Sequence, residues 1–188
     1  MARIPYVDPS QFDDKTAQLI DRLAPLNIFR MMSHVPGLLR PFVDLGGAFL
    51  FDGTLDPITR ECAILRVGYL SNARYETAQH EKIGLDIGMT QDLFAALKSG
   101  PDAEGLTDEQ RLTVAYVDDL VAHVKAGDAT FQPALAHFGA ETLQELTLVT
   151  GYYMMVCRFL ETFEVDVEDG GAKGLDLANP DALSDQAG

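Results

Sequence analysis

Residues 60–80, RECAILRVGYLSNARYETAQH, decide how this sequence is interpreted. The first half is strongly apolar, and Asp56 followed by a proline supplies an N-cap and a favoured first-turn residue. The pattern predicts one helix that runs to about Leu70 and a second that is capped by Asn72 and ends before Gly88, a suitable C′ residue. A short turn between the two helices would pack them against each other, so that side chains from both face the same point.

Most other periodic segments also have helical spacing. Thr90 starts one segment, and Thr107 with Gln110 forms a capping box in front of an amphipathic stretch. Residues 36–53 are helical in pattern, with a proline and two glycines that bend the helix. Residues 141–165 are apolar on most sides, which predicts a helix in the middle of a bundle or at a subunit interface.

The fold class expected from these patterns is all-α. About seven to nine helices form a single domain in residues 1–167. Residues 168–188 are rich in glycine and acidic side chains, and they are expected to be an extended or disordered tail.

The composition limits the partners of the protein. The chain has 188 residues, of which 47% are hydrophobic and 23% charged, and its net charge is −15. An acidic chain is repelled by nucleic acid and by anionic membrane surfaces, so neither is expected as a partner. Because no apolar run reaches roughly 18 residues and the start lacks the core of a signal peptide, a cytoplasmic location is expected. Cys62 and Cys157 lie in apolar surroundings and are expected to be buried, reduced thiols.

Glu76 and His80 are the leading candidates for chemistry. They lie four positions apart, so on a helix they share one face and can touch. Glu61 can approach the same point from the preceding helix, where a polar residue in so apolar a run is expected to be paired or functional. A carboxylate beside an imidazole orients the ring, and a second carboxylate nearby shares its proton. Such a set can take a proton from one atom of a substrate and return it to another.

Candidate substrate-binding residues flank this pair. Tyr75, Arg74 and Arg66 supply a phenol and two guanidinium groups, which can hold a carboxylate or an enolate oxygen. His34, before a proline-glycine turn, either lines the site or has a capping or packing role. A glutamate–histidine pair also occurs on solvated helices without any function, where it contributes only about a few tenths of a kcal/mol.

Other kinds of site have little support. Motifs for dinucleotides, for phosphate loops and for α/β-hydrolases do not occur, and the repeated E-x-x-H of di-iron bundles is absent. Neither a metal nor an organic cofactor is expected. His123 and His137 are expected to be structural or to face solvent.

The helices R-E-C-A-I-L-R-V (60–67) and R-Y-E-T-A-Q-H (74–80) resemble those of the carboxymuconolactone decarboxylase and alkyl hydroperoxidase D superfamily. The resemblance extends weakly to H-V-P-G-L (34–38) and to L-Q-E-L-T-L-V-T-G-Y-Y (143–153), so that it covers roughly residues 15–165. It implies an all-helical bundle that assembles into a dimer, trimer or hexamer. It also implies a site near a subunit interface and a small-molecule substrate.

The hydroperoxidase branch has the motif E…C-x-Y-C-x-x-x-H, in which the two cysteines carry a disulfide. Here Glu61, Tyr75 and His80 match the glutamate, the tyrosine and the histidine. Ala73 and Glu76 take the places of the two cysteines. Without a thiolate at these positions there is no nucleophile for a peroxide O–O bond.

The resemblance therefore implies a decarboxylase-like lyase that does acid–base chemistry on a small carboxylic acid or lactone. In this hypothesis Glu76 and His80 act as acid and base, and Glu61 orients His80. Arg74 or Arg66 anchors the substrate carboxylate. Two alternatives stay open, namely an antioxidant of the peroxidase type and a non-catalytic helical assembly or ligand-binding module.

Overall fold

The structure, a computed structural model, describes residues 1–23 and 25–173. Over these residues it contains helices and loops without a strand, which confirms the predicted all-α class. The α-helices are α1 (Asp14–Arg22), α2 (Asn27–Met32), α3 (Pro36–Gly47), α4 (Pro57–Leu70), α5 (Arg74–Asp86), α6 (Gln91–Ser99), α7 (Asp108–His123) and α8 (Asp128–Phe163). A 3-10 turn, η1 (Pro9–Gln11), precedes α1, and a π-helical turn, η2 (Ala48–Asp52), continues α3. Residues 174–188 of the predicted tail lie outside the described residues.

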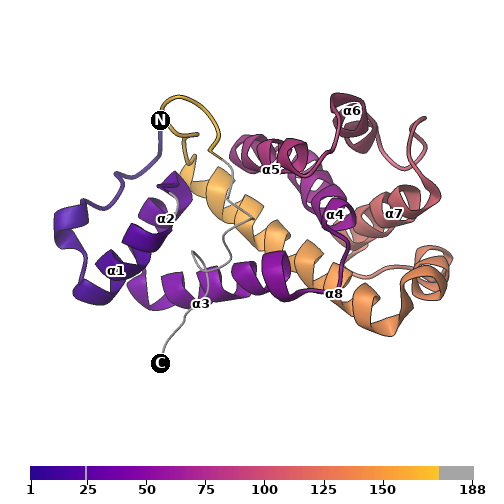
Figure 1. The fold of residues 1–188 in the computed structure, drawn as a ribbon, viewed down its shortest axis with the longest axis horizontal. Coiled ribbons are helices and arrows are strands. Elements are labelled where there is room, and N and C mark those ends of the chain that lie inside the picture. Colours follow the sequence, from indigo (N-terminus) through magenta and orange to yellow (C-terminus); the bar gives the residue numbers. More distant parts are fainter. Residues whose placement is uncertain (24, 174–188) are drawn as a thin grey trace.

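Helix α4 lies at the centre of the bundle. It packs against α5, α6, α7 and α8, and α3 runs on the other side of α8 (Figure 1). Every residue from Thr59 to Gly68 is buried, so α4 has no face toward solvent. Most of the apolar core surrounds this helix, and a smaller cluster lies between α4 and α6. A helix buried on all sides is what the continuous apolar run predicts.

The helix ends follow most of the predicted caps. The Asp56 side chain accepts hydrogen bonds from backbone N–H groups at the start of α4. Thr107 and Gln110 form the capping box of α7. The prediction that Asn72 caps α5 is wrong, because Ala73 occupies the N-cap position and makes no side-chain hydrogen bond. Asn72 instead adopts a left-handed conformation with φ of 51°, which asparagine tolerates better than most residues, and completes the turn between α4 and α5.

Two predicted helices have different bounds in the structure. Residues 141–165 form the second part of α8, which starts at Asp128 and bends at Gly139, where φ is 74°. The stretch 36–53 is α-helical only as far as Gly47 and then continues as the π-helical turn η2. The bend in α8 uses a positive φ at Gly139, a conformation that glycine adopts more readily than other residues.

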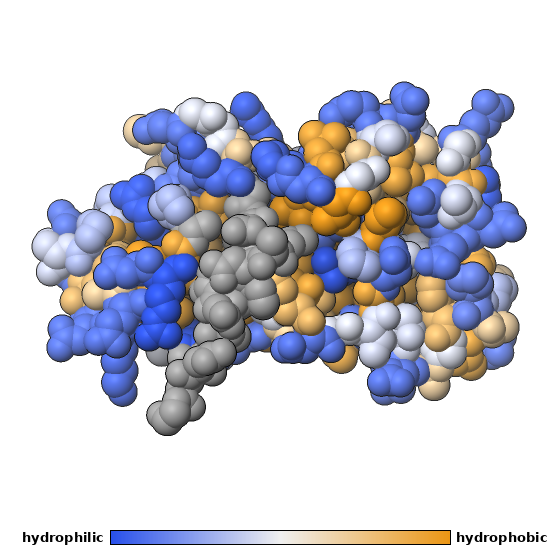
Figure 2. Space-filling view, viewed as in Figure 1, coloured by the Kyte–Doolittle hydropathy of each residue, from blue (hydrophilic) through white to orange (hydrophobic). Residues whose placement is uncertain are grey.

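The chain after α8 returns to the N-terminus (Figure 1). The backbone N–H of Arg3 donates to the carbonyl of Phe163 at 2.9 Å, and the N–H of Ala2 donates to Asp166 at 2.9 Å. The exposed surface is mostly hydrophilic around α1, whereas hydrophobic residues gather over α4, α5 and α6 (Figure 2). None of the helices in the described ranges combines the length and the apolar character that crossing a bilayer requires.

Candidate active site

Three ionisable side chains from α4 and α5 meet inside the bundle. Nδ1 of His80 donates a hydrogen bond to Oε2 of Glu61 at 2.7 Å, and Nε2 of the same ring lies 3.1 Å from Oε1 of Glu76. Glu61, Glu76 and His80 are only 0%, 3% and 5% exposed. The structure therefore brings together the three residues that stand out in the sequence, and it removes them from bulk water.

Local features of the two helices explain why these side chains meet. Because α4 is buried on all sides, Glu61 cannot reach solvent and must be paired inside the protein. Glu76 and His80 lie one turn apart on α5 and share a face. Gly68 permits a close crossing of the helices, since a Cβ atom at this position would lie 2.9 Å from Cγ2 of Thr77.

The two carboxylates hold a positive charge on the imidazole. Burial alone lowers the pKa of His80, but Glu61 and Glu76 outweigh burial and raise this pKa from 6.5 to about 10. His80 is therefore an imidazolium at neutral pH. A further cation stands behind Glu61, because Nε of Arg60 lies 3.5 Å from Oε1 of that carboxylate. Two buried carboxylates thus face two buried cations, an arrangement that limits the cost of burying each charge.

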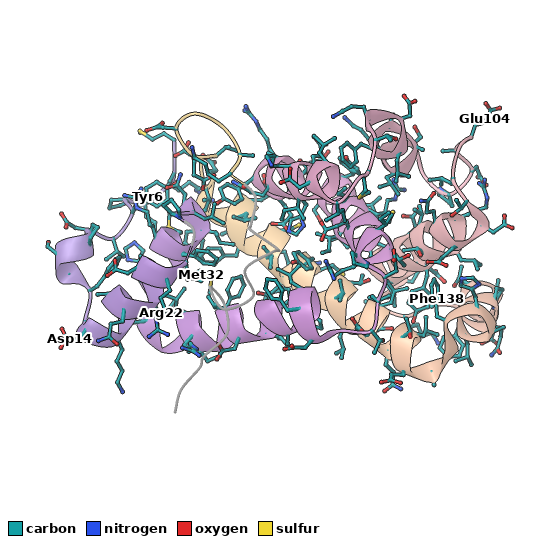
Figure 3. All side chains as sticks on the ribbon, viewed as in Figure 1. Tyr6, Asp14, Arg22, Met32, Glu104 and Phe138 are labelled. Carbon is teal, nitrogen blue, oxygen red and sulfur yellow. The ribbon has the colours of Figure 1, made fainter. Side chains whose placement is uncertain are left out.

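A small cavity lies beside the array that Glu61, Glu76 and His80 form. It has a volume of about 70 Å³, and Glu76 and His80 form part of its wall, whereas Glu61 stands behind the imidazole. Side chains fill the space between α3, α5 and α8 around it (Figure 3). Its apolar wall includes Phe29, Phe42, Val43, Leu50, Ile83 and Val156. The polar part of its wall consists of Tyr75, Glu76, Gln79, His80, Tyr152 and Tyr153.

One aromatic residue of the cavity wall touches the imidazole. The ring of Tyr153 on α8 meets the ring of His80 edge-on, with the centroids 5.0 Å apart and an angle of 86° between the planes. This contact fixes the plane of the imidazole, which Glu61 and Glu76 already hold at its two nitrogens. The array is therefore rigid before any ligand binds, as acid–base chemistry requires.

Comparison with known proteins bears directly on the segment that carries the array. Residues 36–100 match the carboxymuconolactone decarboxylase family, and this range includes Glu61, Glu76 and His80. Over these residues the chain is similar to that family. The resemblance found in the sequence is thereby confirmed. No curated protein matches the chain.

Solved structures share the fold of this chain over most of its length. An uncharacterized peroxidase-related protein from Silicibacter sp. TM1040 is 14% identical, with a TM-score of 0.78 and coverage of 92% of this chain and 93% of that chain. A peroxidase-related protein with an alkylhydroperoxidase AhpD core, from Ralstonia eutropha JMP134, is 19% identical, with a TM-score of 0.75 and coverage of 90% and 93%. At these identities the likeness establishes the fold alone.

The structure does not bring all of the predicted substrate-binding residues to the cavity. Tyr75 lines the cavity. Arg66 instead binds Asp118 with two of its nitrogens, at 2.5 and 2.8 Å, and ties α4 to α7. Arg74 is exposed at the start of α5, and His34 is exposed and bound to a backbone carbonyl. Neither predicted arginine therefore lies on the cavity wall.

Glu168, which the sequence analysis places in the predicted tail, is a buried carboxylate next to the cavity. Glu168 is 8% exposed, and its Oε1 accepts hydrogen bonds from the hydroxyl of Tyr75 at 2.6 Å and from the backbone N–H of Asn27 at 2.7 Å. Its Oε2 accepts a hydrogen bond from the side-chain amide of Gln79. The segment after α8 thus holds two residues of the cavity wall, a role that an acidic, glycine-rich sequence does not signal.

Cys62 and Cys157 are both buried and lie off the cavity wall. Burial raises the pKa of the Cys62 thiol to about 12, with nearby carboxylates adding to the effect. Burial likewise raises the pKa of the Cys157 thiol. Neither thiol forms a thiolate at neutral pH, and among the described residues no cluster of three metal-binding side chains is found.

Proposed function

We propose that the chain is a decarboxylase-like enzyme that moves a proton on a small carboxylic acid or lactone. The observation that carries the proposal is the imidazolium of His80, which is fixed between the buried carboxylates of Glu61 and Glu76 at the wall of an apolar cavity. Acid–base catalysis needs proton donors and acceptors that are held in place in a site with little water. Decarboxylation, dehydration and isomerisation all use such a set.

The geometry supports distinct roles for the three residues. Glu76 lines the cavity and is the carboxylate that can reach a substrate proton. His80 is positively charged beside it, so it stabilises negative charge that develops on the substrate and can donate a proton. Glu61 does not line the cavity and acts through His80, whose Nδ1–H it holds. A well-placed acid or base typically contributes about 10²–10⁴-fold in rate.

An antioxidant of the peroxidase type is the alternative that the names of the similar structures suggest. That chemistry needs a nucleophilic sulfur, and both thiols are buried with raised pKa values. The proton-transfer proposal uses groups that do lie on the cavity wall. It is therefore the stronger of the two.

Proton transfer can be measured without knowing the final product. The protein is incubated in D2O with a panel of small lactones and carboxylic acids, and proton NMR follows the loss of signal at the carbon next to the carbonyl. We expect exchange with the wild-type protein and a loss of about 10²–10⁴-fold with Glu76→Gln. Glu81→Gln is the matched control, because Glu81 lies on the same helix but off the cavity wall. Full exchange activity in Glu76→Gln or in His80→Ala would rule the mechanism out.

The proposal includes a homo-oligomer. Large hydrophobic side chains are exposed on α8 and in the turn that precedes it, namely those of Leu148, Met155 and Val124, as expected of a subunit interface. Sedimentation analysis tests this point. We expect a species larger than one chain, and a monomer at micromolar concentration would contradict it.

A further inference from the structure

Helix α4 carries two buried arginines with different surroundings. Arg66 is 7% exposed and donates hydrogen bonds to the carboxylate of Asp118 and to two backbone carbonyls of α6. Arg60 is 4% exposed, and its buried Nε has no hydrogen-bond partner. A buried guanidinium nitrogen without a partner costs stability, so a purely structural role explains Arg66 and does not explain Arg60.

The group that Arg60 faces is the carboxylate of Glu61. Nε of Arg60 lies 3.5 Å from Oε1 of Glu61, beyond the range of about 2.7–3.2 Å that is typical of N–H···O hydrogen bonds. Oε1 of Glu61 accepts no hydrogen bond, whereas Oε2 accepts one from His80 at 2.7 Å. The guanidinium therefore acts on Glu61 through its charge. Because Glu61 is fully buried, water does not screen this attraction as it would at the surface.

The two carboxylates beside the imidazolium are therefore not equivalent. Glu61 has a hydrogen bond from the ring and the charge of Arg60. Oε1 of Glu76 lies 3.1 Å from the ring but accepts no hydrogen bond. Neither lysine nor arginine lines the cavity beside Glu76 among the described residues, and residues 24 and 174–188 contain none. Because a hydrogen bond and a nearby cation both favour the ionised form, Glu61 stays ionised and Glu76 is the carboxylate that can take a proton.

The other ionisable groups near the array do not replace Arg60. Burial raises the pKa values of three tyrosines and two thiols, which are therefore uncharged at neutral pH, namely Tyr75, Tyr152, Tyr153, Cys62 and Cys157. Further charges act on the two thiols, and these belong to Asp56, Glu109, Glu161 and Arg158. Of these four only Arg158 is positive, and its side chain is exposed on α8.

We propose that Arg60 is a positioning residue that keeps Glu61 ionised and so directs proton uptake to Glu76, the carboxylate on the cavity wall. The inference rests on the proposed proton-transfer function and adds the group that decides which carboxylate acts as the base. Arg60 does not line the cavity and acts through Glu61. Without this cation the two carboxylates would share a proton across the ring, and a proton held by Glu61 cannot reach the cavity.

The role of Arg60 follows from the balance of charge during proton transfer. Glu76 takes a proton from a C–H bond of the substrate, and the electron pair of that bond stays on the substrate. Ionised Glu61 holds the imidazolium of His80 in place, where it stabilises the new negative charge. Return of the proton from Glu76 to the substrate restores the array, and Arg60 keeps its own proton throughout.

Nitrogen-detected NMR of the His80 ring can follow the two carboxylates separately, because Nδ1 faces Glu61 and Nε2 faces Glu76. In an acid titration of the wild-type protein, we expect the Nε2 signal to respond at a higher pH than the Nδ1 signal. In Arg60→Met the Nδ1 response should move to higher pH by at least about one unit, because an opposite charge beside Glu61 is lost. Arg60→Lys keeps the charge and should restore the wild-type order. An unmoved Nδ1 response in folded Arg60→Met would overturn the inference.

Arg66→Met is the matched control, because it removes the other buried arginine of the same helix. We expect this substitution to lower stability through the lost contacts with Asp118 and to leave the Nδ1 response of His80 unchanged. An equal shift in both variants would make the effect structural, and the inference would fail. Should Arg60→Met not fold, Arg60→Gln removes the same charge, keeps a polar side chain and is titrated in its place.

Exchange measurements in D2O distinguish this inference from the proposed function. We expect Arg60→Met to lower the exchange rate by about tenfold or more and to move the acidic limb of its pH profile upward together with the Nδ1 response. If the Nδ1 response moves and the wild-type protein exchanges no substrate proton, the proposed function fails and the action of Arg60 on Glu61 stands. If Arg60→Met keeps the wild-type rate and pH profile, the inference fails and the proton-transfer function stands.

Discussion

Oε2 of Glu61 lies 2.7 Å from Nδ1 of His80, across the packed interface of two helices, while Glu76 occupies the other side of the same ring. The two carboxylates have different surroundings. Glu76 borders the cavity, and Glu61 is enclosed by protein with Arg60 beside it. Two chemically identical groups can therefore have different roles, one that acts on a ligand and one that holds the imidazolium.

Replacing the enclosed carboxylate tests this division. Glu61→Gln keeps the size of the side chain but removes the charge beside Nδ1, so we expect the pKa of His80 to fall. Proton exchange on a substrate should fall by about 10-fold or more, but less than with Glu76→Gln, because Glu61 does not reach the ligand. NMR of the imidazole and the exchange assay report the two effects. An unchanged pKa of His80 would show that Glu61 does not hold its charge.

The stability of the protein should decrease at alkaline pH. The pKa of His80 is about 10 in the folded protein against 6.5 for the unperturbed side chain. The stabilisation from its protonation is therefore fully present below about pH 6.5 and is lost as the pH rises through about 10, with a slope of up to about 1.4 kcal/mol per unit. Urea unfolding at several pH values measures this slope. The control is His80→Gln, for which the profile should be flatter, and parallel profiles would contradict the expectation.

Glu168 should stabilise the wall of the cavity. Glu168→Ala leaves the hydroxyl of Tyr75 and the amide of Gln79 without their carboxylate partner, so we expect the free energy of unfolding to fall by about 2–4 kcal/mol. Asp169→Ala, at the exposed neighbouring position, should change it by less than about 0.5 kcal/mol. Equal effects of the two substitutions, measured by urea unfolding, would mean that the segment after α8 does not support the cavity.

The two thiols should be unreactive in the folded protein. Cys62 and Cys157 are buried, and burial raises the pKa of each. A thiol reagent at neutral pH should label both only after unfolding in urea, and Cys62→Ser should leave any consumption of peroxide unchanged. Rapid labelling of the native protein, or loss of peroxide consumption in this variant, would support the peroxidase alternative.

The sequence was most informative where local rules and burial agree. The apolar run around Glu61 predicts a helix buried on all sides, and a glutamate there has to find a partner. The four-residue spacing of Glu76 and His80 predicts a shared face. These two patterns were sufficient to predict that the three side chains meet.

Contacts between distant segments could not be derived from such rules. Arg66 pairs with Asp118 on α7, a partner 52 positions away, so its charge is used outside the cavity. Glu168 lies 93 positions from Tyr75, and its acidic surroundings resemble a solvated tail. Tyr153 belongs to a helix that is apolar on most sides, where periodicity alone does not say which side chain faces a cavity.

The charge of His80 is the property on which the proposed chemistry most directly depends. Nitrogen-detected NMR of the imidazole during a pH titration reports how many protons the ring carries. With Glu61 and Glu76 at its two nitrogens, His80 should keep both ring protons at neutral pH and lose one only as the pH approaches about 10. A ring that titrates near 6.5, like an unperturbed histidine, would contradict the account.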